Sequence, residues 1–274
     1  MAKPSVEAIV KQGRILRVDA PFDEALTTLR EAGCRYPISV EVLAYARMEK
    51  DKRRSLNQNG SYTKEGVIYF RDAKPILALN SPLLDLRLAR QAVQANRDGK
   101  YFSTPDGKMY EKFAKLAEEG KSQEPEKRKA VYLPNTNCTL TTSDADFNNV
   151  LRALFKEAKD DYLTFNGQDI PLYLVDKNTV NALPGTVLTQ MWFRGLDYRS
   201  ELGGDRNLDC GDWVRGVSKS ERASASEGKT QPTQVSLYTK SQLNQAVRLV
   251  KGVRTGNIPA SRLEEVTQFL GRLK

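Results

Sequence analysis

The segment that most constrains this chain is residues 194–217, RGLDYRSELGGDRNLDCGDWVRGV. Its apolar residues recur every six positions, a spacing that fits neither the helical period of about 3.6 residues nor the alternation of a strand. These residues are Leu196, Leu202, Leu208 and Val214. The spacing predicts a winding, loop-rich segment that apolar anchors hold against a core while the intervening side chains face outward.

The composition of this segment favours recognition of a partner. It contains four arginines against four aspartates and one glutamate, and no lysine occurs from residue 178 to 218. Tyr198 and Trp213 add aromatic area. Protein interfaces are enriched in Tyr, Trp and Arg and depleted of Lys, and antibody-like paratopes add Ser, Gly and Asn. The alternative is a glycine-rich loop whose arginines and aspartates pair with one another, and both interpretations are open.

Two more specific binding motifs fit this segment poorly. Residues 205–209 follow the D-x-N-x-D start of a calcium loop, but Cys210 stands where the loop needs glycine and Gly216 where it needs glutamate. An EF-hand is therefore excluded, and a weaker cation site at the aspartates is left open. The glycines follow neither a dinucleotide-binding nor a P-loop order.

The run 191–217, MWFRGLDYRSELGGDRNLDCGDWVRGV, resembles the end of a C-type-lectin-like domain, as used by variable proteins of diversity-generating retroelements. In that family a W-x-R strand opens the final section, a stretch rich in Gly, Ser, Asn, Asp and Tyr winds over the surface, and a strand near an R-G-V motif closes it. Residues 192–194, 196–212 and 214–217 match these parts.

The resemblance implies a non-catalytic ligand-binding protein whose surface is diversified by adenine-directed mutagenesis on a fixed scaffold. It implies a protein or other macromolecular ligand, bound through residues 197–213. The implied contact residues are Asp197, Tyr198, Glu201, Gly203, Asp205, Asn207, Asp209, Cys210, Asp212 and Trp213.

Helical and strand patterns alternate in the rest of the chain, which favours an α+β fold. Helices are expected at 22–32, 40–51 behind a Ser39 cap, 85–96, 109–119 and, behind a capping box of Ser143 and Asp146, 147–155. Strands are expected at 66–70 and 76–79, as a hairpin, and at 130–134, 170–176 and 186–193. The strand at 170–176 is expected to be buried on both faces.

We therefore expect a C-type-lectin-like domain with an additional N-terminal α/β segment and a C-terminal helical hairpin. The expected divisions are a mixed α/β region at 1–129, the lectin-like core at 130–220, a flexible loop at 221–237 and the hairpin at 238–274. Part of the core can come from 60–120. The polar run at 120–129 is the candidate internal boundary, and the terminal hairpin is a candidate oligomerisation or docking element.

Composition limits the chemistry that this chain can perform. It has no histidine, the commonest general base and metal ligand, and its three cysteines, Cys34, Cys138 and Cys210, stand far apart. We expect no enzyme activity, no cofactor, no metal and no disulfide. A histidine-free enzyme with paired carboxylates, such as Asp160 and Asp161 at the end of a helix or the aspartates at 205–212, is a further alternative.

The net charge of +9 keeps a nucleic-acid-associated basic protein as the second hypothesis. Its basic clusters, at 50–54 and 126–129, are either solvated surface or a nucleic-acid footprint. No stretch approaches the roughly 20 apolar residues of a membrane helix, and residues 1–20 lack the apolar centre of a secretory signal. We expect a cytoplasmic protein with no membrane partner.

Overall fold

A computed structural model describes residues 13–48, 60–167, 169–195, 200–204, 208–209 and 213–219. By internal contacts the chain divides into two units, Met1–Ser224 and Ala225–Lys274. All described residues belong to the first unit. The loop predicted at 221–237 and the helical hairpin predicted at 238–274 lie outside the described residues.

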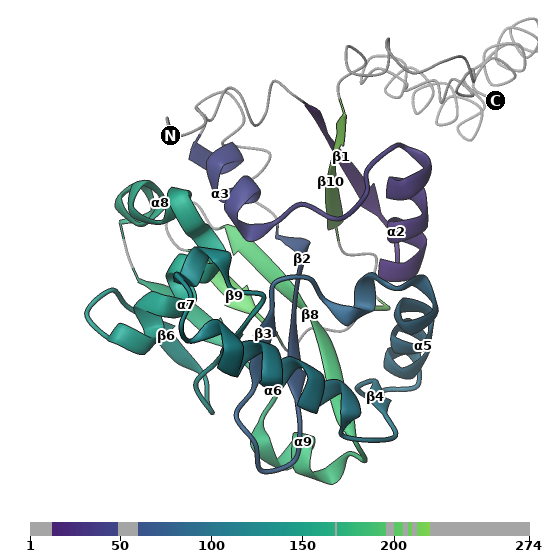
Figure 1. Cartoon of the computed structure of the whole chain (residues 1–274). Helices are drawn as coiled ribbons and strands as arrows, with labels where there is room; N and C mark the ends of the chain where they lie inside the picture. Colours follow the sequence, from purple (N-terminus) through teal and green to yellow (C-terminus); the bar gives the residue numbers. More distant parts are fainter. Residues whose placement is uncertain are drawn as a thin grey trace, which may run out of the picture. The chain divides into compact units, whose positions relative to one another are not determined.

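A mixed β-sheet forms the centre of the first unit (Figure 1). Two of its strands, β1 and β10, come from opposite ends of this unit and pair antiparallel over seven positions. The neighbouring strand β2 pairs with β10 in parallel and with β8 antiparallel. In spatial order the sheet runs β1 (Gly13–Asp19), β10 (Trp213–Lys219), β2 (Ser61–Tyr69), β8 (Thr186–Gly195), β9 (Ser200–Gly203), β7 (Ile170–Tyr173) and β6 (Cys138–Leu140).

Three short strands branch from this path. β3 (Ile76–Ala78) pairs with β2 and with β5 (Ala130–Tyr132), and β4 (Ser103–Thr104) pairs with β8. The β2–β3 pair confirms the predicted hairpin. Because β3 and β5 lie on either side of residues 120–129 in the chain, that polar run connects strands of one sheet.

The β2–β8 pair contains an irregularity that one side chain fills. Tyr62 lies opposite Trp192 and Gly66 opposite Gln190, so β2 has more residues than β8 between these pairs. The extra residues bulge out of the ladder and free backbone carbonyls. The Gln190 side-chain nitrogen donates to the carbonyls of Thr63 and Glu65, the latter at 2.7 Å. Gln190 thus satisfies buried backbone groups at the middle of the sheet.

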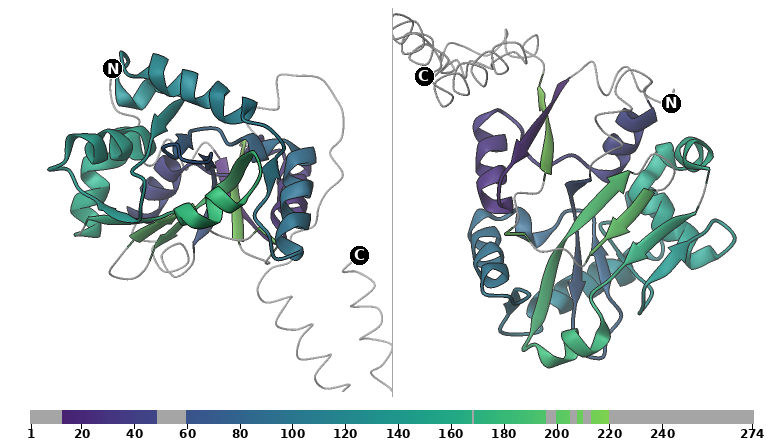
Figure 2. Two further views of the ribbon diagram at one scale, coloured as in Figure 1. Left: turned by 90° about the horizontal axis from the view of Figure 1, so that it is seen from below. Right: turned by 180° about the vertical axis from the view of Figure 1, so that it is seen from behind.

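Helices pack against the sheet in two groups, each with its own apolar cluster. α2 (Phe22–Glu31), α5 (Leu86–Arg97) and α6 (Lys108–Gly120) contribute to one cluster, and α3 (Val40–Met48), α7 (Ala145–Phe155) and α8 (Lys159–Asn166) to the other. Seen from behind, β7, β8 and β9 lie side by side, with α6 and α7 on their far side (Figure 2). The shorter helices are η1 (Pro82–Leu84), η2 (Pro125–Lys127), η3 (Lys156–Ala158) and α9 (Lys177–Ala182).

Local sequence signals account for most of these elements. The predicted helices at 22–32, 85–96, 109–119 and 147–155 and the strand at 186–193 are confirmed within a few residues at their ends. Ser39 caps α3, because its hydroxyl accepts the Val42 N–H at 3.2 Å. The described part of that helix ends at Met48, and residues 49–51 of the prediction lie outside the described residues.

Three local predictions need correction. The cap of α7 is Asp144, because the helix begins at Ala145, and the Asp144 carboxylate accepts the N–H groups of Asp146 and Phe147 at 2.9 Å. The Ser143 hydroxyl bonds instead with that of Thr141. Asp160 and Asp161 lie in the first turn of α8, where acidic residues suit the helix dipole, and not at a helix end. The strand predicted at 170–176 ends at Tyr173, which is 37% exposed.

Candidate recognition segment and its support

The segment singled out by sequence enters on β8 and leaves on β10, with β9 between them in the chain. Within the β8–β9 pair, Trp192 lies opposite Gly203 and Arg194 opposite Glu201. At the far end, Val214 of β10 lies opposite Val18 of β1 and next to Tyr62 of β2. Both ends of the segment are therefore fixed in the sheet, on the two sides of β2.

The predicted apolar anchors are buried. Leu202 and Val214 have no exposed surface and Leu208 is 2% exposed. Leu202 joins the cluster of α3, α7 and α8, whereas Leu208 and Val214 join the cluster of α2, α5 and α6. The prediction is confirmed for these three anchors, and Leu196 lies outside the described residues. The segment is thus attached to both apolar clusters.

The backbone of Leu208 is held on both sides by hydrogen bonds. Its N–H donates to the side-chain oxygen of Asn96 at 2.7 Å, and its carbonyl accepts the N–H of Phe22 at 3.0 Å. Phe22 is the first residue of α2, so its N–H has no partner within the helix, and Leu208 supplies one. Asn96 is itself fixed, because its side-chain nitrogen donates to the Lys100 carbonyl at 2.8 Å.

Gly204, directly after β9, is a second backbone anchor. Its N–H donates to the Tyr173 carbonyl at 2.8 Å, and its carbonyl accepts the hydroxyls of Tyr69 at 2.9 Å and Thr189 at 2.6 Å. A Cβ at this position would lie 2.7 Å from a methyl carbon of Val67. The site therefore requires glycine, and three hydrogen bonds fix the chain where it leaves the sheet.

A buried arginine supports the facing ends of β8 and β9. Arg47 is fully buried, donates to the Phe193 carbonyl at 2.9 Å and lies 4.0 Å from the centre of the Phe193 ring. It also donates to the Tyr162 hydroxyl at 3.4 Å, which in turn lies 2.6 Å from the Ser200 hydroxyl. Phe193 and Ser200 flank residues 194–199, so one arginine–tyrosine pair holds the chain on both sides of that connection.

Both buried arginines of this region have lowered pKa values. Burial lowers the pKa of Arg47, and burial together with the nearby charges of Arg47 and Arg17 lowers the pKa of Arg215 to about 10. Arg215 of β10 also donates to the Gly60 carbonyl at 2.7 Å. With a pKa of about 10, Arg215 stays charged at neutral pH, and both guanidinium groups donate to backbone carbonyls.

The structure describes four of the ten predicted contact residues. Gly203 is buried in β9, between β7 and β8, and the Glu201 side chain is 16% exposed and 3.5 Å from Arg194, so neither is openly displayed to solvent. Asp209 is half-buried, and Trp213 lies in β10 opposite Asp19. Six lie outside the described residues: Asp197, Tyr198, Asp205, Asn207, Cys210 and Asp212.

The residues that hold the segment were not found from the sequence. For Asn96 a signal existed, because it follows Leu88 and Ala92 at four-residue steps on the apolar face of α5, where a polar residue needs a partner. For Tyr69, Thr189 and Arg47 no local pattern distinguishes a residue that binds distant backbone from an ordinary strand or helix residue.

The described residues add little chemistry to this region. Among them, no group of three or more His, Cys, Asp or Glu residues could hold a metal ion. Most of the aspartates at 205–212 lie outside that part of the chain, so the weak cation site stays a prediction. Burial raises the pKa of the free thiols of Cys34 and Cys138. No helix in the described ranges combines the length and apolar character of a membrane span.

The sheet, with the segment that enters on β8 and leaves on β10, has a C-type-lectin-like fold. The chain is similar to a solved structure from Nanoarchaeota in which the C-type lectin fold accommodates massive sequence variation. The match has a TM-score of 0.50 and covers 77% of this chain and 100% of that one. At 12% sequence identity the likeness shows the fold alone. No family model and no curated protein matches the sequence.

Proposed function

We propose that this protein is a non-catalytic ligand-binding protein that displays a diversified recognition surface, residues 197–213, on a C-type-lectin-like scaffold. The observation that carries the proposal is how the segment is attached. Leu202, Gly204, Leu208 and Val214 hold it by apolar burial and by bonds to its backbone.

Such an attachment suits a surface that varies. Backbone hydrogen bonds, like those at Gly204 and Leu208, do not depend on the side chains at the positions between them. Residues 205–207 and 209–212 can therefore change without removing an anchor. The polar groups that hold the backbone come from elsewhere in the domain: Asn96 from α5, Tyr69 from β2 and Thr189 from β8.

Two further observations support diversification. The residue types at 205–207 and 209–212 (Asp, Asn, Gly, Arg and Cys) are reachable by adenine-directed changes of asparagine codons, as the resemblance to variable proteins implies. The Nanoarchaeota protein of the same fold accommodates massive sequence variation. We propose a protein or other macromolecular ligand, which binding surfaces rich in Tyr, Trp and Arg commonly recognise.

The first test compares a loop variant with an anchor variant. Replacing Asp205, Asn207, Cys210 and Asp212 together by serine should change the free energy of unfolding by less than about 2 kcal/mol, since the proposal assigns all four to the surface, where substitutions each contribute about ±0.5 kcal/mol. Leu208→Ala should cost about 2–5 kcal/mol. Urea unfolding followed by circular dichroism measures both. A loop variant that loses its fold would contradict the proposal.

The second test addresses diversification directly. Copies of the gene from close relatives are sequenced and compared over residues 190–217. We expect substitutions concentrated between the anchors, with Leu202, Gly204, Leu208 and Val214 constant. Uniform drift along the segment would contradict a diversified surface. Tight duplex DNA binding that weakens steeply with salt, and that is unaffected by the serine variant, would favour the nucleic-acid hypothesis instead.

A further inference from the structure

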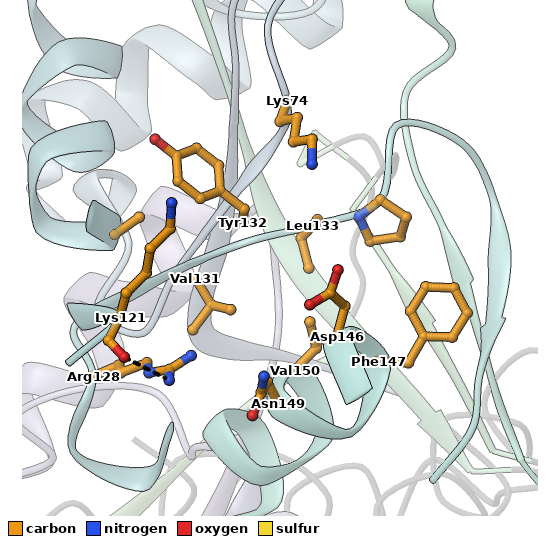
Figure 3. A pocket seen from close by; sticks show the side chains of 12 residues that line it. Lys74, Lys121, Arg128, Val131, Tyr132, Leu133, Asp146, Phe147, Asn149 and Val150 are labelled. Carbon is orange, nitrogen blue, oxygen red and sulfur yellow. Dashed lines mark hydrogen bonds between the residues drawn. The ribbon is translucent and has the colours of Figure 1, made fainter. Parts of the chain in front are cut away.

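A cavity of about 460 Å³ lies away from the recognition segment (Figure 3). Its walls come from α6, β5 and the first turns of α7, together with Lys74 before β3. None of its lining residues belongs to β8, β9 or β10. The volume falls within the roughly 300–1,000 Å³ of small-molecule sites, so the cavity is large enough for a compact organic ligand.

The cavity has an apolar side formed by its aliphatic and aromatic residues. Val131, Leu133 and Val150 are buried beneath it, and Phe147 is partly buried against the same cluster. In the apolar stripe of α7, formed by Phe147, Val150, Leu151, Leu154 and Phe155, Phe147 is the one residue that is not fully buried. An apolar ligand body can therefore contact surface that is continuous with the core.

The charged side of the cavity is mostly positive. Lys74, Lys121 and Arg128 line it, against the single carboxylate of Asp146. Lys121 is paired with Glu118 at 2.7 Å. Among the described residues Lys74 and Arg128 have no carboxylate partner, and Arg128 donates only to the carbonyls of Gln123 and Lys121, at 3.1 and 3.5 Å. Two cations at the cavity thus form no ion pair with a described carboxylate.

Neighbouring contacts keep these groups in place. The Tyr110 hydroxyl donates to the Lys74 carbonyl at 2.8 Å, and the Tyr110 ring is stacked on Phe70. Figure 3 shows Lys74 extending toward Asp146, and Lys121 beside the Tyr132 ring, whose centre lies 5.6 Å from the lysine nitrogen. Burial and a hydrogen bond with Glu118 raise the pKa of Tyr132 to about 12, so its phenol stays neutral.

We propose that this cavity binds a small organic anion, with an aromatic or aliphatic body and one carboxylate or phosphate group. The anionic group interacts with Lys74 and the body contacts Leu133 and Phe147, while Arg128, on the opposite side of the cavity in Figure 3, adds positive charge. Asp146 disfavours ligands with further negative charge nearby. The site is independent of the recognition segment, so either proposal can fail without the other.

The test is a titration of the full-length ¹⁵N-labelled protein with phenyl phosphate and with benzoate, followed by amide chemical shifts. Benzyl alcohol, which has the same ring and no charge, is the control ligand. We expect saturable shifts at residues 131–133 and 146–150 with both anions, and much weaker shifts with the alcohol. Shifts that do not saturate, that lie elsewhere, or that are equal for benzyl alcohol would overturn the proposal.

Variants separate specific binding from general attraction to a basic surface. Lys74→Gln with Arg128→Gln should weaken phenyl phosphate binding about tenfold or more, because one charge-assisted contact and a second positive charge of the cavity are lost. Lys115→Gln is the matched control, since Lys115 is an exposed lysine of α6 that does not line the cavity. If Arg128→Gln alters the fold, Lys74→Gln alone should still weaken binding. Equal weakening by the control variant would contradict a dedicated site. Displacement of the anions by duplex DNA would also contradict it, because the anions would then be bound only by a generally basic surface.

Discussion

Asn96 and Leu208 are joined by a hydrogen bond of 2.7 Å across 112 positions of the chain. The donor is a backbone N–H of the recognition segment, and the acceptor is a buried side chain of α5. The order of the segment at Leu208 therefore depends on a residue that no ligand needs to contact. A change at Asn96 should alter the segment without changing any residue proposed to bind.

Replacing Asn96 by alanine should leave the Leu208 N–H and the Lys100 carbonyl without their partners. Such a loss typically costs about 1–3 kcal/mol of stability. Urea unfolding measures the cost, and hydrogen exchange should show the Leu208 amide exchanging faster than in the parent protein. Gln94→Ala is the control, because the Gln94 amide bonds only to exposed Asp98. Unchanged exchange at Leu208 would disprove the role of Asn96.

Gly60→Ala should disturb the packing of Trp192. A Cβ at Gly60 would overlap the indole ring, which is 8% exposed and packs edge-on against Tyr62 at 4.9 Å. Overpacking of a core typically costs about 1–3 kcal/mol. We expect lower stability in urea and altered tryptophan fluorescence. Gly120→Ala, where the nearest atom is a flexible Arg128 carbon at 3.3 Å, should be close to neutral, and equal losses in both variants would contradict this account.

Tyr162→Phe should loosen the connection between β8 and β9. The substitution keeps the ring that stacks on Phe155 but removes the hydroxyl shared by Arg47 and Ser200. We expect a loss of about 1 kcal/mol and faster hydrogen exchange at the Ser200 amide. Tyr173→Phe, at a residue that is 37% exposed, is the control. If Ser200 exchange is the same in both variants, the hydroxyl does not hold the connection.

Glu65 should make stability depend on pH. Burial raises the pKa of this carboxyl, which is 2% exposed and accepts the Val40 N–H at 3.2 Å. Above the unfolded pKa of about 4.3, the folded protein binds more protons than the unfolded chain, so its stability falls as pH rises through the folded pKa. Glu65→Gln should remove that decline. Urea unfolding between acidic and neutral pH measures it, and parallel pH profiles of the two proteins would contradict the assignment.

About half of the described elements were predicted from the sequence, whereas β1, β6, β9 and α8, and the arrangement of the strands, were not. Local periodicity predicts the apolar stripe of α7 and the turn-bounded strands of the β2–β3 hairpin. The pairing of β10 with β1 and β2 joins residues that are distant in the chain, and no local pattern specifies which strands become neighbours. The family resemblance supplied the fold class, which the structural comparison supports.

The candidate site divides in the same way. The leucine spacing predicted the burial of Leu202 and Leu208, because apolar side chains show their need for a core in the sequence itself. The anchoring of Gly204 depends on hydroxyls of β2 and β8, which come together only after the sheet has formed. The burial of Gly203 could not be predicted from the sequence, because it follows from the pairing of β9 with β7 and β8.

The seven-position pairing of β1 with β10 has a consequence for how this protein can be divided or recombined. A fragment that begins at residue 130 would carry β10 with neither of its sheet neighbours. Replacing the residues between Gly204 and Leu208 by a foreign stretch is thus a local exchange. Joining the first half of one homologue to the second half of another, in contrast, pairs β10 of one protein with β1 and β2 of the other. New binding specificities should therefore be transferred by exchanging short stretches between the anchors, while the first sixty or so residues stay with the scaffold.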